Sequence, residues 1–200
     1  MNLPNKITIA RIIMIPVFML FAFPLPAWFP GEQFFSGRYS ALIALILYII
    51  ASVTDTLDGH IARKYNLITS FGKFLDPIAD KLLVMAAMFA LVPMNKMYLW
   101  IAMIILTREF IVTGVRLVAA SEGVVIAAGK GGKLKMVLQT IALITLLASK
   151  LFIGTTGLVE TIGVVVSIFG DVMLIAAAIV TIVSGIEYVK TNISLIAKDM

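Results

Sequence analysis

Six long apolar runs, separated by short gaps, constrain this chain more than any other feature of its sequence. Runs of this kind suit helices that cross the roughly 30 Å hydrocarbon core of a bilayer at a rise of about 1.5 Å per residue. They cover approximately residues 8–23, 39–54, 74–92, 98–119, 134–153 and 159–183. We therefore expect an all-α integral membrane protein with six transmembrane helices, forming a single domain over residues 1–200.

Composition supports this class of protein and excludes others. Hydrophobic residues make up 61% of the chain, whereas ordinary soluble domains contain about 45–50%. The absence of cysteine excludes disulfides, thiol catalysis and cysteine-ligated metal sites. Pro24, Pro26 and Pro30, rather than a small-residue cleavage site, follow the first apolar run. We therefore predict a retained helix and not a cleaved signal peptide.

Positive charge is distributed unevenly between the two sides of the predicted helices. An even number of spans places both termini on one side, and of the 16 lysines and arginines only Arg38, Lys96 and Lys150 then fall on the other. Basic residues concentrate on the cytoplasmic side of membrane proteins. We predict cytoplasmic termini and a multi-pass location in the cell membrane. Such anchors account for the net charge of +5, so nucleic acid is not an expected partner.

Four carboxylates share one place, the predicted cytoplasmic ends of the second and third runs: Asp55, Asp58, Asp76 and Asp80. Spacings of i,i+3 and i,i+4 put each pair on one helix face. An aspartate in the membrane centre costs about 2.5–3.5 kcal/mol, and less toward the interface. Mg²⁺ or Mn²⁺ would relieve both this cost and the mutual repulsion, because hard cations prefer carboxylate oxygen. The alternative is a solvated network of acids paired with neighbouring lysines and arginines.

Small residues and one arginine extend the acidic faces. Gly59 and Gly72 each lie four residues from an aspartate of the cluster, and Ala62 is similarly small. Bare helix surface lets a bulky ligand lie against the backbone. Arg63 lies four residues after Gly59, and its planar guanidinium group is suited to binding phosphate. His60, the single histidine, is interpreted as a surface residue.

Residues 55–80 as a whole follow the pattern D-x2-D-G-x2-A-R-x8-G-x3-D-x3-D, with all eight fixed positions present. This pattern is the signature of the CDP-alcohol phosphotransferase family, and the resemblance extends over the whole chain. It implies six transmembrane helices with cytoplasmic termini, an active site at the cytoplasmic ends of helices two and three, and a homodimer. Members of the family transfer the phosphate-linked group of a CDP-activated donor to an alcohol and release CMP.

The resemblance also implies roles for the motif residues. Two Mg²⁺ or Mn²⁺ ions would be held by Asp55, Asp58 and Asp76, with Asp80 as a further ligand. Asp80 is also implied as the general base for the incoming hydroxyl, a role that the proton chemistry requires of some group. The donor, CDP-diacylglycerol, would contact the following positions: Asp55, Asp58, Gly59, Ala62, Arg63 and Gly72.

Cations outside the motif exceed what one CDP headgroup requires. A second anion would account for them, so we predict an acceptor-phosphate site made of Thr8, Arg11, Arg108, Arg116, Lys133 and Lys135. Glu109 is expected to pair with one of the two arginines beside it in the fourth run. The segments Arg-Glu-Phe at 108–110 and Leu-Asp-Pro-Ile-Ala-Asp-Lys at 75–81 are similar to family members whose acceptor is glycerol 3-phosphate. The alternative for each cation is a positive-inside anchor.

Other acceptors and one other class of protein stay open. Phosphatidylglycerol, giving cardiolipin, is the main alternative acceptor, and inositol phosphate is the next. A cation transporter is a remote alternative, because transporters place their sites near the membrane midplane. Asp171 stands alone in the last run, with no role beyond a hydrogen bond to another helix or to a partner subunit. Residues 129–133 lack the spacing of a phosphate-binding loop and are interpreted as a flexible connector.

Overall fold

The computed structural model describes residues 3–64, 70–121, 123–124 and 130–196. Within these ranges the side chains of residues 3–4, 56–64, 70–71, 73–74, 130 and 193–196 are not described. The described chain is helical, and its elements are α1 (Leu3–Ala22), α2 (Arg38–Lys64), α3 (Ser70–Leu91), α4 (Met97–Ser121), α5 (Lys130–Ser149), a short 3₁₀ helix η1 (Lys150–Phe152) and α6 (Leu158–Ile196). The predicted all-α fold is confirmed.

Four of these helices are long and apolar enough to cross a membrane, judged over the described residues. The qualifying segments are Asn5–Ala22, Arg38–Asp55, Gly131–Phe152 and Leu158–Asn192. The other two helices, α3 and α4, carry several of the charged residues of the cavity described below. The chain is thus a membrane protein with several candidate spans, and six spans with cytoplasmic termini remain a prediction.

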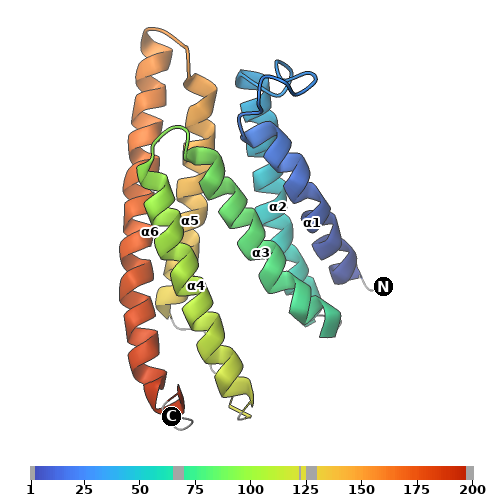
Figure 1. The fold of residues 1–200 in the computed structure, drawn as a ribbon, viewed down its shortest axis with the longest axis vertical. Helices are drawn as coiled ribbons and strands as arrows, with labels where there is room; N and C mark the ends of the chain where they lie inside the picture. The colour runs from blue at the N-terminus through green and yellow to red at the C-terminus, as the bar shows by residue number, and fades with distance from the viewer. Residues whose placement is uncertain (1–2, 65–69, 122, 125–129, 197–200) are drawn as a thin grey trace.

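The helices form two groups that meet along the middle of the molecule (Figure 1). In one group α1 packs against α2 and α3, and in the other α6 packs against α4 and α5. Contacts of α2 with α5, and of α3 with α4 and α5, join the groups. The α1–α2, α3–α4 and α5–α6 connections lie toward one end of the bundle, and both chain termini lie toward the other (Figure 1).

Helix ends follow the breakers in the sequence. Helix α1 ends at Ala22, just before Pro24 and Pro26, which lack the N–H that helix continuation needs. Gly37, with φ at +90°, adopts a left-handed conformation directly before α2, one that suits glycine because it has no Cβ. Pro93 follows the last residue of α3 by two positions.

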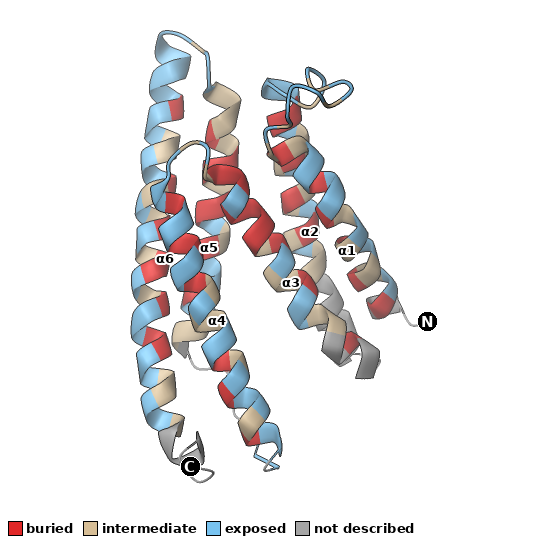
Figure 2. Cartoon of the chain, in the orientation of Figure 1, coloured by how far each residue is buried: buried red, intermediate tan, exposed pale blue. Residues whose placement is uncertain are grey.

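Both small and large apolar side chains are buried between the helices, and many large apolar side chains are exposed on the outside (Figure 2). Ala51, Ala87 and Ala102 are fully buried, whereas Trp28 and Trp100 are 81% and 74% exposed. Outward-facing apolar residues continue along α6. Such a surface is unfavourable in water and suits lipid, in agreement with the apolar runs of the sequence.

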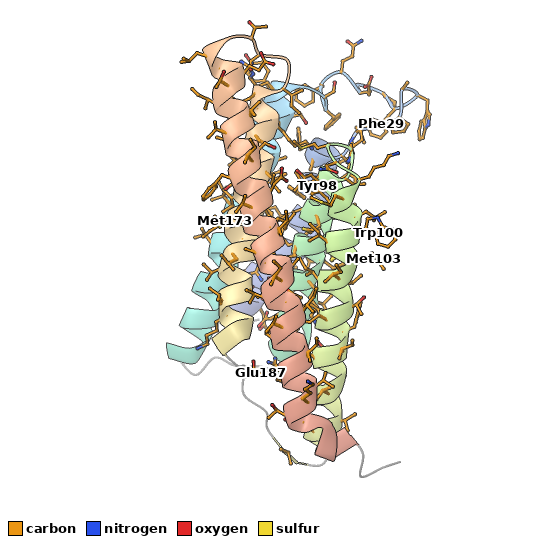
Figure 3. The ribbon with its side chains drawn as sticks, turned by 90° about the vertical axis from the view of Figure 1, so that its left-hand side faces the viewer. Phe29, Tyr98, Trp100, Met103, Met173 and Glu187 are labelled. Atoms are coloured by element: carbon orange, nitrogen blue, oxygen red, sulfur yellow. The ribbon has the colours of Figure 1, made fainter. Side chains whose placement is uncertain are left out.

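Polar side chains tie the helices together at the end away from the termini. The Lys150 ammonium donates to the backbone carbonyls of Ala22 at 2.8 Å and Ala90 at 3.1 Å, where α1 and α3 have carbonyls without helical partners. The Tyr98 hydroxyl donates to Asp171 at 2.7 Å, so Asp171 binds another helix of its own chain. Tyr98 lies near this end of the bundle and Glu187 near the opposite one (Figure 3).

Candidate functional site

A cavity of about 700 Å³ lies among α2, α3, α4, α5 and α6. Apolar side chains such as Leu83 and Ile105 form part of its lining, and charged side chains from all five helices form another part. We call Asp55 and Asp80 of this lining, together with Asp76 one turn before Asp80 on α3, the carboxylate wall. The cation wall is the set of lining residues on α4 and α5: Arg108, Glu109, Arg116, Lys133 and Lys135. The structure therefore places motif residues and predicted acceptor residues around the same space.

Helix α1 donates hydrogen bonds to two acids of the carboxylate wall. Arg11 is 1% exposed, and its guanidinium donates to Asp55 at 2.5 Å. One turn earlier on α1, the hydroxyl of Thr8 donates to Asp76 at 2.7 Å. Asp55 and Asp80 line the cavity. Helix α1 thus fixes two of the predicted metal ligands, although it contributes none itself.

The donor set of the carboxylate wall fits a hard divalent cation. Asp55 on α2 and Asp80 on α3 bring carboxylate oxygens from two helices to one cavity, and Mg²⁺ and Mn²⁺ favour oxygen ligands. Among the side chains that the structure describes, no group of three or more acidic or histidine residues is close enough to hold an ion. The side chain of Asp58, one turn beyond Asp55, lies outside them.

Of the remaining motif positions, Gly72 is among the described residues. Gly72 is buried near the start of α3. Gly59, Ala62 and Arg63 lie on the last turns of α2, and with His60 they fall outside the described side chains. Their predicted contacts with the CDP donor remain predictions.

On the cation wall, one acid bridges two cations. Oε1 of Glu109 accepts a hydrogen bond from Lys135 Nζ at 2.6 Å and another from Arg108 Nη1 at 3.0 Å. Lys135 is 6% exposed, so its charge depends on such a partner. Of the two arginines predicted as partners of Glu109, the structure selects Arg108 and adds Lys135.

Arg116 is paired with an aromatic ring instead. Its Nε donates to the Tyr188 hydroxyl at 3.2 Å, and its guanidinium carbon lies 5.7 Å from the ring centroid, which is within cation–π range. Lys133 lines the cavity and is exposed. Lys81 Nζ donates to the Thr113 hydroxyl at 2.6 Å and so connects α3 to α4 beside the cavity.

Glycines let α4, α5 and α6 approach closely at the cation wall. A Cβ on Gly131 would lie 2.8 Å from the Cβ of Ser184, and one on Gly185 would lie 2.9 Å from Cγ of Arg108. Both distances are shorter than ordinary contacts between carbon atoms. The prediction of a flexible connector is wrong for residues 130–133, because α5 begins at Lys130. Within this segment Gly131 packs against Ser184 of α6, and Gly132 packs against the Arg108 side chain.

Ser184 and Tyr188 were missed by the sequence-based prediction. Arg108 Nη2 donates to Ser184 Oγ at 3.4 Å, and Tyr188 contacts Arg116. A signal was present, because Thr181, Ser184 and Tyr188 are spaced by three and four residues within an apolar run, which places them on one helix face. Arg11 and Thr8, which were predicted to bind the acceptor, contact Asp55 and Asp76 of the carboxylate wall, and their part in acceptor binding remains a prediction.

Comparisons with known proteins agree with the motif. Residues 1–183 match the family described as CDP-alcohol phosphatidyltransferase. A CDP-diacylglycerol–glycerol-3-phosphate 3-phosphatidyltransferase of Bacillus subtilis (strain 168) is 45% identical over 96% of this chain and 95% of its own length. A protein of the same description from Rickettsia typhi is 39% identical, over 94% of this chain and 96% of its own. A probable phosphatidylglycerophosphate synthase of Mycobacterium tuberculosis (strain H37Rv) is 36% identical, over 94% and 80%.

Proposed function

Because this chain belongs to the CDP-alcohol phosphatidyltransferase family, we propose that it transfers the phosphatidyl group of CDP-diacylglycerol to glycerol 3-phosphate. The products are phosphatidylglycerophosphate and CMP, which makes the chain an enzyme of phospholipid biosynthesis. Relatives at up to 45% identity over nearly the whole chain support the choice of acceptor. The observation that carries the proposal is the cavity itself, whose lining includes Asp55 and Asp80 of the motif together with Arg108, Arg116, Lys133 and Lys135.

The carboxylate wall serves the donor. Asp55, Asp58 and Asp76, with Asp80, would hold two Mg²⁺ or Mn²⁺ ions, which when bound neutralise charge on the diphosphate and on the departing CMP. Arg11 and Thr8 keep Asp55 and Asp76 in place. The donor itself would also be bound by Gly59, Ala62, Arg63 and Gly72.

Asp80 serves the acceptor hydroxyl as general base. Its carboxylate lies on the lining of the cavity that Arg108, Arg116 and Lys135 also line. As the acceptor oxygen forms its bond to the phosphatidyl phosphorus, its proton passes to Asp80, and the bond from that phosphorus to CMP breaks. A base positioned in this way typically contributes about 10²–10⁴-fold to the rate.

The cation wall serves the acceptor phosphate. Arg108 and Lys135 lie within hydrogen-bonding distance of one carboxylate oxygen, and Arg116 and Lys133 line the same cavity. Charge-assisted hydrogen bonds to a phosphate dianion are about twice as strong as neutral ones. Free glycerol would leave these cations without an anion, so it should be a poor acceptor.

Orientation and assembly are parts of the same proposal. The cavity lies toward the end of the bundle that holds both termini, where α2 ends and α5 begins. The distribution of lysine and arginine supports a cytoplasmic location for that end. A homodimer is carried over from the family resemblance.

One assay tests the proposed reaction. Purified enzyme is given CDP-diacylglycerol and Mg²⁺ or Mn²⁺ with glycerol 3-phosphate, phosphatidylglycerol, inositol phosphate or glycerol, and CMP release is measured. We expect glycerol 3-phosphate to be turned over fastest and excess EDTA to abolish turnover. Faster turnover of phosphatidylglycerol would make cardiolipin synthesis the better function. No CMP release with any of these acceptors would contradict the proposed reaction.

A further inference from the structure

Glu109 is the one acid of the cation wall, and a single oxygen of its carboxylate accepts from two cations on different helices. We propose that Glu109 is a positioning residue, which fixes the spacing of Arg108 and Lys135 so that the pair binds a phosphate monoester on the acceptor. This inference rests on the proposed function, because it names how the acceptor site of that reaction is set up. Glu109 itself would not touch the reacting atoms.

The first support is the electrostatics of the pair. Arg108 comes from α4 and Lys135 from α5, and two like charges at this proximity repel. The Lys135 side chain is 7% exposed and that of Arg108 is 14% exposed, so water screens the repulsion poorly. A carboxylate that touches both is therefore needed to hold the two cations near each other.

The second support is the confinement of Arg108 on its other side. A Cβ on Gly185 would lie 2.9 Å from Arg108 Cγ, and a Cβ on Gly132 would lie 3.7 Å from its Nη2. The second distance is an ordinary contact, so it is the glycine at 185 that makes room for the arginine, whose Nη2 reaches Ser184. Arg108 is thus fixed by helix packing, and the position of Lys135 relative to it depends on Glu109.

The third support is unused donor capacity. A guanidinium has five N–H donors and an ammonium has three. Among the described residues, Arg108 uses one for Glu109 and one for a long contact with Ser184, and its buried Nε has no hydrogen-bond partner there. Lys135 uses one donor for Glu109. Both cations can therefore bind Glu109 and a phosphate oxygen at the same time.

A simpler role for Glu109 would be to lower the positive charge of the cavity. Two substitutions separate charge from position. Glu109→Asp keeps the charge but shortens the side chain by one methylene, so one oxygen no longer reaches both cations. Glu187→Gln removes the same charge from another acid on the cavity lining, which is exposed and has no ion pair among the described residues.

The experiment compares wild-type enzyme with Glu109→Gln, Glu109→Asp and Glu187→Gln in the CMP-release assay. Each KM is measured for glycerol 3-phosphate and for CDP-diacylglycerol. We expect both Glu109 variants to raise the KM for glycerol 3-phosphate by about tenfold, the size of one charged hydrogen bond lost. The KM for CDP-diacylglycerol should stay within about twofold of wild type, because the carboxylate wall is intact. Glu187→Gln should change both values by less than about twofold, as expected for a screened charge.

Several results would overturn the inference. A wild-type KM for glycerol 3-phosphate in Glu109→Asp would show that charge, not position, matters. An equal rise in Glu187→Gln would show the same, and an equal rise in both KM values would point to general disruption. If both Glu109 variants failed to fold in detergent, Glu109 would be a stability residue. The wild-type enzyme tests the proposed function separately. If wild type did not use glycerol 3-phosphate, the proposed function would be rejected whatever the Glu109 variants did.

Discussion

The two walls of the cavity are stabilised in opposite ways. On the carboxylate wall Asp55 and Asp80 line the cavity, and the cationic partner of Asp55, Arg11, lies on α1 outside the lining. On the cation wall the acid, Glu109, lies among the cations and lines the cavity with them. One wall therefore has its counter-charge outside the cavity, and the other has it inside.

This difference bears on what each wall can bind. Arg11 donates to one oxygen of Asp55, and Asp55 also lines the cavity, where a metal ion would bind. On the cation wall an incoming anion meets cations that are already partly neutralised, which reduces the cost of keeping them together and weakens their pull on any single anion. We expect changes on the carboxylate wall to abolish turnover and changes on the cation wall to alter acceptor affinity.

The largest effect should follow from removing the proposed base. Asp80→Asn should lower kcat by about 10²–10⁴-fold while the KM for the donor rises less than in Asp55→Asn. Asp171→Asn is the matched control, because it makes the same change at the other end of the bundle, where the Tyr98 hydroxyl can still donate to an amide oxygen. Near-normal kcat in Asp80→Asn would remove it from catalysis. Loss of donor binding equal to that of Asp55→Asn would make Asp80 chiefly a metal ligand.

The next effect tests whether the counter-charge behind the carboxylate wall is essential. Arg11→Met should destabilise the protein by about 3–5 kcal/mol, because removing one partner of a buried ion pair leaves the other charge uncompensated. Turnover should fall with it, since Asp55 loses its anchor. Lys6→Met, an exposed position on the same helix, is the control and should unfold at the wild-type temperature. Equal thermal stability of the two variants would show that α1 does not support the wall.

The two walls also differ in how much of each could be predicted from the sequence. The carboxylate wall lies within 26 residues of contiguous sequence, and helical spacing together with the cost of burying acids was enough to find its members. The cation wall depends on contacts between distant segments, such as Lys135 with Glu109 and Arg108 with Ser184. Charges in an apolar run indicated that these residues have partners but not which ones.

The start of α5 illustrates the limit of local propensity. Glycines at 129, 131 and 132 predict a loop because glycine disfavours helix by about 1 kcal/mol relative to alanine. The structure instead begins α5 at Lys130, where Gly131 makes room for Ser184. Tertiary packing overrides the local preference here, and no pattern within the segment shows that packing. The role of α1 behind Asp55 was missed for the same reason, since Arg11 and Asp55 are 44 residues apart in the chain.

A moderate effect should separate buried from exposed cations on the cation wall. Lys135→Met should raise the KM for glycerol 3-phosphate by about 10–100-fold, corresponding to a charged hydrogen bond of about 1.5–3 kcal/mol. Lys133→Met, two residues earlier on the same helix and exposed, should raise it by only about twofold to threefold. Both KM values come from initial rates of CMP release at saturating donor. Equal effects would place the acceptor phosphate at the mouth of the cavity instead.

A smaller effect should follow from closing the gap between α5 and α6. Gly131→Ala places a methyl group 2.8 Å from the Cβ of Ser184, and overpacking of this kind costs about 1–3 kcal/mol. The matched control is Gly114→Ala on α4, whose added Cβ meets nothing within 4 Å. Thermal unfolding in detergent should show a lower midpoint for the first variant only. An unchanged midpoint for Gly131→Ala would mean that the two helices adjust without loss.

The smallest effect should come from the weakest polar contact on the cation wall. Ser184→Ala removes only the hydroxyl that accepts from Arg108 at 3.4 Å, a long hydrogen bond, and keeps the Cβ that packs beside Gly131. The KM for glycerol 3-phosphate should rise by less than about twofold, a fraction of one net hydrogen bond.

Thr8→Val, its counterpart on the carboxylate wall, removes a 2.7 Å hydrogen bond to Asp76. That bond has a charged acceptor and good geometry, so its loss should lower kcat by about tenfold. If Ser184→Ala were the more damaging of the two, then Arg108 would depend on Ser184 and not on Glu109 for its position. The contrast between counter-charges inside and outside the cavity would then not explain how the cation wall is ordered.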